Sequence, residues 1–177
     1  MTDVVRDWRD ELVEAHPSLF RSPEGRPGPS CLPECGEGWR DLLDRACVRI
    51  RAAVEADGGA FTATQIKEKF GTLRFYWRGD LSDEAEAKVD EAIELAEARS
   101  ACTCEVCGEE GRLHKSGDWL TTRCDAHARG TPVEAEADGE NVVVQRVVGA
   151  RTSFRRYDRA ADSFVDIDPA SFGTEEE

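Results

Sequence analysis

The sequence predicts an α+β fold with two amphipathic helices, a central β-hairpin, an embedded treble-clef-like zinc finger and a β-rich C-terminal extension. Three observations predict it. Apolar residues recur at helical spacing over residues 39–54, apolar and polar residues alternate over 73–78, and two pairs of metal-ligand residues lie within 104–127. The predicted segments are an N-terminal helix (1–20), a Pro/Gly-rich linker (21–34), a helix–hairpin–helix core (35–101), a zinc finger (102–130) and an acidic β-rich extension with a frayed C-terminus (131–177).

The composition limits the class of protein. The 177 residues include 23 Lys and Arg against 37 Asp and Glu, which gives a net charge of -14. Hydrophobic residues make up 40% of the chain, enough for a sizeable core. No apolar run approaches the length of a membrane span and the N-terminus is charged from its third residue, so we expect a cytoplasmic protein without a signal peptide. The negative charge disfavours unassisted binding to nucleic acid or anionic lipid.

The first part of the chain is predicted to contain a short helix, a loop and a long helix. Apolar side chains recur every three or four residues over 2–15, which is typical of an amphipathic helix. Four prolines and two glycines in 21–33 exclude a helix or a central strand, so we expect a loop that presents Cys31 and Cys35. The apolar stripe over 39–54 then predicts the long helix, which ends at a Gly-Gly pair.

A hairpin and a second long helix are predicted next. Over residues 60–78 the pattern changes to period two, and Gly71 separates two β-prone stretches. Ser82 is the predicted N-cap of a helix that extends to about Arg99. Farther along, an acidic linker is predicted, followed by three strands. The linker covers 132–140, and the strands lie within 141–148, 152–159 and 162–168.

Two pairs of candidate metal ligands follow the second long helix. Cys104 and Cys107 have the spacing of a zinc knuckle, and Gly108 permits the close turn that follows it. Cys124 and His127 form the second pair, and 16 residues separate it from the first. Three thiolates and one imidazole complete a tetrahedral zinc site with no open position, which is typical of a structural zinc. The alternative is a set of reduced thiols buried as small apolar groups, which does not explain two correctly spaced pairs.

The segment between the pairs predicts the rest of the finger. Residues 116–118 have the chemistry of a hairpin turn, and the second pair is expected to open a short helix. A knuckle, a hairpin and a ligand pair on a helix are the parts of a treble clef. Cys102 is too close to the knuckle to be a normal ligand, and His114 lies on a predicted strand, so we expect neither to bind the metal.

Cys35 offers an alternative chemistry. It stands directly before the long helix, where the helix dipole lowers the pKa of a thiol and favours a nucleophile. No base stands beside it in the sequence, and a loop thiol without a catalytic role is the simpler interpretation. The Gly-Lys-Ser/Thr ending of a phosphate-binding loop is also absent. We therefore assign no catalytic residue.

One basic and aromatic strip stands out in this acidic chain. It comprises Lys67, Lys69, Arg74, Tyr76 and Arg78 of the predicted hairpin. It is the candidate partner-binding surface, although a solvated strand face above an apolar one would show the same pattern. The acidic faces of the second long helix and of the C-terminal extension are further candidates for protein contacts.

Several separated motifs resemble a known group of proteins. They are CGEGW (35–39), ATQIKEKFGTLRFY (63–76), AEARS (96–100), CEVCGEEG (104–111) and CDAHA (124–128). In this order they resemble small proteins found in phages, prophages and bacterial genomes. The resemblance covers about residues 35–128 and implies the hairpin and the finger but no activity. Cys102 and the extension after Gly130 lie outside it.

These observations lead to one hypothesis and one alternative. The leading hypothesis is a zinc-stabilised, acidic cytoplasmic protein that binds or regulates another protein, as an accessory factor of a mobile element. The alternative is a metal-dependent enzyme or binding module that acts on nucleic acid or nucleotides. Only three histidines are present, which leaves few residues for a second, catalytic constellation. A protein without enzymatic activity is therefore favoured, and the oligomeric state is not predicted.

Overall fold

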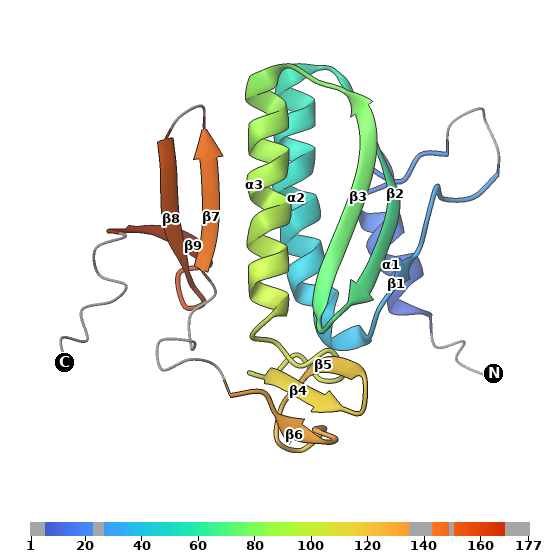
Figure 1. The fold of residues 1–177 in the computed structure, drawn as a ribbon. Coiled ribbons are helices and arrows are strands. Elements are labelled where there is room, and N and C mark those ends of the chain that lie inside the picture. Colours follow the sequence, from blue (N-terminus) through green and yellow to red (C-terminus); the bar gives the residue numbers. More distant parts are fainter. Residues whose placement is uncertain (1–5, 23–26, 135–142, 149–150, 169–177) are drawn as a thin grey trace, which may run out of the picture. The chain divides into compact units, whose positions relative to one another are not determined.

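The computed structural model describes residues 6–22, 27–134, 143–148 and 151–168 (Figure 1). The chain forms two compact units, Met1–Val133 and Glu134–Glu177. The fold is mixed α+β, as predicted. The elements of the first unit are α1 (Trp8–Ala15), β1 (Pro33–Glu34), the 3-10 turn η2 (Glu37–Trp39), α2 (Arg40–Asp57), β2 (Ala60–Lys69), β3 (Thr72–Asp80), α3 (Asp83–Ser100), β4 (Arg112–Ser116), β5 (Trp119–Arg123) and β6 (Thr131–Pro132).

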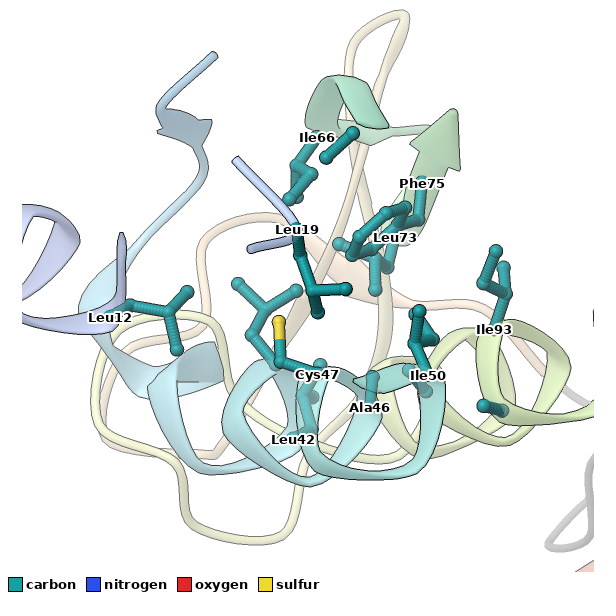
Figure 2. Packing of buried hydrophobic residues seen from close by; sticks show 14 of the residues in the cluster. Leu12, Leu19, Leu42, Ala46, Cys47, Ile50, Ile66, Leu73, Phe75 and Ile93 are labelled. Carbon is teal, nitrogen blue, oxygen red and sulfur yellow. The ribbon is translucent and has the colours of Figure 1, made fainter. Parts of the chain in front are cut away.

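The core of the first unit lies between two long helices and a three-stranded sheet of order β1-β2-β3. Helices α2 and α3 lie side by side along one face of the sheet (Figure 1). Apolar side chains from α2, from both long strands and from α3 fill the space between them (Figure 2). Fully buried members include Leu43 and Ile50 of α2, Ile66 and Leu73 of the sheet and Val89 of α3. The predicted helical stripes and strand alternation are confirmed here, because their apolar positions are the buried ones.

Helix α1 is shorter than the predicted helix over 2–15. It begins at Trp8 because the Asp7 side chain accepts a hydrogen bond from the Arg9 N–H and caps the helix. Trp8 and Leu12 are buried. Residues 2–5 of the predicted helix lie outside the described residues.

The predicted Pro/Gly-rich linker contains a strand. Within it, Pro33 and Glu34 form β1, which pairs in parallel with Ile66 and Lys67 of β2. Proline fits there because β1 is an edge strand that does not need every backbone donor. The expectation that this loop presents Cys35 is wrong, since Cys35 is only 6% exposed and belongs to the core. Cys31 is half-buried.

The two hairpins of the first unit meet at one end of the core. Strands β2 and β3 pair with Ile66 opposite Phe75 and Lys67 opposite Arg74. Their turn lies near the C-terminal end of α3, beside the small sheet of order β5-β4-β6 (Figure 1). This arrangement places the cysteine-rich segment at the end of the sheet, where both hairpins and α3 converge.

The second unit is an antiparallel sheet of order β7-β8-β9. Its strands are β7 (Val143–Val148), β8 (Arg151–Asp158) and β9 (Ser163–Ile167), which confirms the three predicted strands. The buried Tyr157 hydroxyl donates to the Asp162 carboxylate at 2.6 Å. Most of the predicted linker over 132–140 and the frayed C-terminus lie outside the described residues. In the described part of the chain, no helix combines the length and apolarity that crossing a membrane requires.

Candidate metal centre

The first ligand pair lies on a tight turn after α3. The Gly108 N–H donates to the Cys104 carbonyl at 2.8 Å, and the Cys104 N–H donates to the Glu109 carbonyl at 2.8 Å. Gly108 has a φ of +80°, a conformation that favours glycine. The backbone therefore closes on itself and directs the side chains of Cys104 and Cys107 toward one point.

The second pair comes from the end of the finger hairpin. Cys124 follows β5 directly, and the His127 N–H donates to the Cys124 carbonyl at 3.0 Å. Residues 125–127 form a turn rather than the predicted short helix. The prediction of a helix at this point is wrong, because residues 128–130 do not continue the turn as a helix.

The four ligand atoms lie close together. The Sγ atoms of Cys104, Cys107 and Cys124 and a ring nitrogen of His127 all lie within 4.8 Å of one another. The Cys107 and Cys124 sulfurs are 3.6 Å apart, and the His127 Nδ1 lies 3.2 Å from the Cys124 sulfur and 3.7 Å from the Cys104 sulfur. Bond lengths to zinc of about 2.3 Å for sulfur and about 2.0 Å for nitrogen give tetrahedral edges of about 3.5 to 3.8 Å. The cluster is compatible with one tetrahedral metal ion.

The electrostatics of the knuckle differ between its two thiols. Burial raises the pKa of Cys104, but backbone N–H groups, including those of Cys124 and Cys107, outweigh it and lower the pKa to about 6. The backbone N–H of Glu109 lowers the pKa of the exposed Cys107, but loss of hydration and the neighbouring thiols outweigh it, so that pKa is raised. Because the thiolate is the form that binds metal, the backbone prepares Cys104 for ligation.

Cys102 and His114 lie outside the cluster, as expected. The Cys102 thiol points to the end of α3, where its sulfur lies 3.3 Å from the Arg99 carbonyl. His114 is 3% exposed, and its Nδ1 lies 2.9 Å from the Arg112 carbonyl oxygen. Among the described residues, the Cys3His group is the one cluster of three or more side chains suited to a metal ion. Four protein ligands leave no position for a substrate, so the arrangement suits a structural metal.

The sequence did not predict how tightly the knuckle packs against the start of α2. The N–H of Gly38 donates to the Glu105 carbonyl at 2.9 Å, and the Trp39 indole N–H donates to the Thr103 carbonyl at 2.9 Å. A Cβ at Gly36 would lie 2.3 Å from the Glu105 carbonyl oxygen, so only glycine permits this approach. The one sequence signal of this contact was that CGEGW and CEVCG both belong to the ordered set of motifs that resembles phage and prophage proteins.

Glu105 connects the knuckle to the start of α2 and to strand β5. Its Oε1 accepts a hydrogen bond from the Gly36 N–H at 2.9 Å, and its Oε2 lies 2.7 Å from the Arg123 guanidinium. The two side chains of this ion pair are only 12% and 19% exposed. The carboxylate therefore joins the start of α2 to strand β5, which carries the second ligand pair.

A second contact joins the finger to the core hairpin. The Thr122 hydroxyl donates to the Gly71 carbonyl at 2.7 Å in a buried setting. On the core side, the Leu73 N–H donates to the Ser100 hydroxyl at 2.8 Å. The KEKFG turn, the end of α3 and the finger are thus joined by buried hydrogen bonds, each of which contributes about 1 kcal/mol.

Substitution of Glu105 tests this junction. We expect Glu105→Gln to lower the free energy of unfolding by about 2 to 3 kcal/mol, because Arg123 would keep a largely buried charge without its carboxylate partner. Urea unfolding of the metal-loaded protein measures this difference. The control is Glu109→Gln on the same turn, where the side chain is exposed and a change below about 0.5 kcal/mol is expected. Equal destabilisation by the two variants would contradict the proposed role of the carboxylate.

The structure disfavours Cys35 as a nucleophile. Burial and the nearby Glu105 carboxylate raise the pKa of Cys35 to about 12, even though the thiol precedes a helix. Burial and the Asp44 carboxylate likewise raise the pKa of Cys47 to about 12. Both thiols therefore stay protonated at neutral pH. The Cys31 thiol, with a pKa raised to about 11 by burial, does so as well.

Thiol labelling checks these shifts. We expect iodoacetamide at pH 8 to modify Cys35 and Cys47 at least about 100-fold more slowly in the native protein than in urea, because few of the native thiols ionise. Peptide mass spectrometry measures the rates, and the urea sample is the control. Stabilisation from these protonated thiols is complete below the ordinary thiol pKa of 9.0 and is lost as the pH rises toward 12. Equal rates in the two samples would contradict the shifts.

The predicted strip lies together on one face of the core hairpin. Lys67 pairs across the strands with Arg74, and Tyr76 pairs with Gln65, while Ile66 and Phe75 point to the core. Tyr76 is 45% exposed. The register therefore places all five strip residues on the side opposite the core, and their use by a partner stays a prediction.

Comparisons of the chain with protein-family models, with curated proteins and with solved structures gave no match.

Proposed function

We propose that this protein is a zinc-stabilised, acidic binding module that acts through contacts with another protein. The observation that carries the proposal is the closed Cys3His cluster, whose spacing suits one tetrahedral ion. Its donor set of three thiolates and one imidazole favours zinc over the harder cations, which prefer oxygen ligands. In this role the ion holds the finger, and the finger supports the end of the core.

The finger is proposed to be a treble-clef variant. The knuckle and the β4–β5 hairpin are two of the three parts of that fold, and the turn over 124–127 takes the place of the usual helix. Cys104, Cys107, Cys124 and His127 would hold the ion. None of the seven cysteines, all of which lie in the described part of the chain, forms a disulfide, which is in keeping with a reducing cytoplasm. The resemblance to phage and prophage proteins supports a role as an accessory factor of a mobile element.

Native mass spectrometry of the untagged protein tests the proposal. We expect the mass of the chain plus one zinc ion, with or without a protein partner, since one spectrum reports metal content and bound molecules together. The basic strip, Lys67, Lys69, Arg74, Tyr76 and Arg78, is the proposed contact surface. A second metal, a nucleotide or an oligonucleotide in the spectrum would instead favour the enzyme or nucleic-acid-binding alternative.

A further inference from the structure

The four cations of the strip form no ion pair with a carboxylate in the described part of the chain. Elsewhere in the first unit, cations such as Arg40, Arg45 and Lys88 form ion pairs with carboxylates at 2.7 to 2.8 Å. Among the described residues, no carboxylate forms such a pair with Lys67 or Arg74, or with the other two strip cations, Lys69 and Arg78. In a chain of net charge -14, four cations that share one sheet face and have no carboxylate partner among the described residues need an explanation beyond solvation.

One acidic side chain of α3, Glu97, interacts electrostatically with the strip. The charge of Arg74 lowers the pKa of Glu97, although burial outweighs it and the pKa of Glu97 is raised overall. The Arg74 guanidinium instead donates to the Leu73 carbonyl and the Thr72 hydroxyl, at 2.6 and 2.7 Å. These bonds orient the guanidinium without neutralising it.

The cations lie in rows set by the strand register. Lys69 stands opposite Thr72, Lys67 opposite Arg74, and Arg78 opposite Thr62 at the far end. Tyr76 occupies the row between Arg74 and Arg78. Neighbouring rows on one face of a sheet are about 6.6 to 6.8 Å apart, which is also the spacing of alternate side chains along an extended peptide.

The aromatic rings make a carboxylate partner more suitable than nucleic acid. The Lys67 ammonium lies 5.8 Å from the Tyr76 ring centre, and the Lys69 ammonium lies 5.2 Å from that of Phe70. An ammonium group on one side of each ring competes with a base for stacking on that side. The net charge of -14 also repels a long polyphosphate more than a short peptide.

We propose that the strip binds an extended acidic segment of a partner protein, with carboxylates at alternate positions facing the rows of Lys and Arg. This inference rests on the proposed function, because it specifies the chemistry of the protein partner. The alternate carboxylates would meet Lys69, Lys67 with Arg74, and Arg78, and the Tyr76 hydroxyl would donate between them. Such a contact is screened by salt, so it weakens as ionic strength rises.

Fluorescence anisotropy with a labelled ten-residue peptide of alternating Glu and Ala tests the inference. We expect saturable binding to the zinc-loaded protein at low salt, at least about fivefold tighter than for a block peptide of equal length and charge, in which all the Glu residues precede all the Ala residues. The double variant Lys67→Glu/Arg74→Glu should lose at least about tenfold in affinity. The control double variant Lys88→Glu/Lys115→Glu makes the same change in net charge on exposed residues of α3 and β4, outside the strip, and should lose less than about threefold.

Two controls separate lost binding from lost folding. The first is the neutral variant Lys67→Gln/Arg74→Gln, and the second is a melting curve for each variant. Equal affinity for both peptides, equal loss in both charge-reversed variants, or tighter strip-dependent binding of a single-stranded oligonucleotide would overturn the inference. Zinc content is measured on the same samples. If the protein contains zinc but does not bind the peptide, the result contradicts this inference alone. If the purified protein contains no zinc, the result contradicts the proposed function.

Discussion

Cys107→Ala is expected to unfold the finger and to destabilise the first unit as a whole. Structural zinc contributes about 10 to 16 kcal/mol of apparent binding free energy in isolated fingers, whereas whole domains are stable by only about 5 to 15 kcal/mol. Under the proposed zinc binding, removing one of the four ligands would therefore remove most of the energy that orders residues 104–127. Thermal unfolding followed by circular dichroism should show a lower or broader transition, and metal analysis should show less than one zinc per chain.

Chelation should give the same result in the native sequence. Because Glu105 and Thr122 join the finger to the core, the loss of metal is expected to reach the start of α2 and the β2–β3 turn. Hydrogen exchange would show this as faster exchange at the N–H groups of Gly36 and Gly38. Cys102→Ala is the matched control, because its thiol lies outside the cluster. An unchanged melting curve for Cys107→Ala would contradict the structural role of the metal.

Gly38→Ala is expected to have the second large effect. A Cβ at this position would lie 2.3 Å from the Cys104 carbonyl oxygen and 2.5 Å from the Gly108 backbone nitrogen. Both are backbone atoms of the knuckle, so they cannot move aside as a flexible side chain would. We expect a loss of at least about 3 kcal/mol, at the upper end for overpacked sites, together with weaker zinc binding. Urea unfolding and competition with a zinc-binding dye measure the two effects.

The control for this variant is Gly58→Ala. This variant makes the same glycine-to-alanine change at the C-terminal end of α2. Nothing lies within 4 Å of the Cβ that it adds. Its φ of +78° makes alanine cost about 1 kcal/mol through backbone strain alone. A Gly38→Ala variant with no greater loss than Gly58→Ala, and with unchanged zinc affinity, would show that the knuckle does not depend on this close approach.

Local patterns in the sequence were sufficient to predict most of the elements and the four residues of the Cys3His cluster. The stripe over 39–54 became α2, the Ser82 cap became the start of α3, and the alternation over 60–78 became β2 and β3. These patterns depend on neighbours a few residues apart, which the sequence displays directly. The spacing of Cys104 and Cys107 is local in the same way, and the structure brings both together with Cys124 and His127.

Errors arose where a distant contact overrode a local pattern. A Pro/Gly-rich stretch is normally a loop, but pairing with Ile66 made Pro33 and Glu34 an edge strand. Cys35 was expected on a loop that presents it, but it is buried in the core, and burial raises its pKa to about 12. A helix was expected at the second ligand pair, but the structure has a turn there. The spacing of two ligands does not determine whether the backbone around them is a helix or a turn.

The sequence by itself determined which residues are apolar at which period, and which thiols and imidazole are spaced to share one ion. Only the tertiary structure decided that Gly36 and Gly38 lie against the backbone of the knuckle, and that Glu105 links them to Arg123. The contacts between the two glycines and the knuckle join residues more than sixty positions apart, so no local periodicity encodes them. The glycine contacts form because two backbones approach this closely only where no side chain separates them. The Glu105 contact forms because a largely buried carboxylate is stable only when a cation and hydrogen-bond donors surround it.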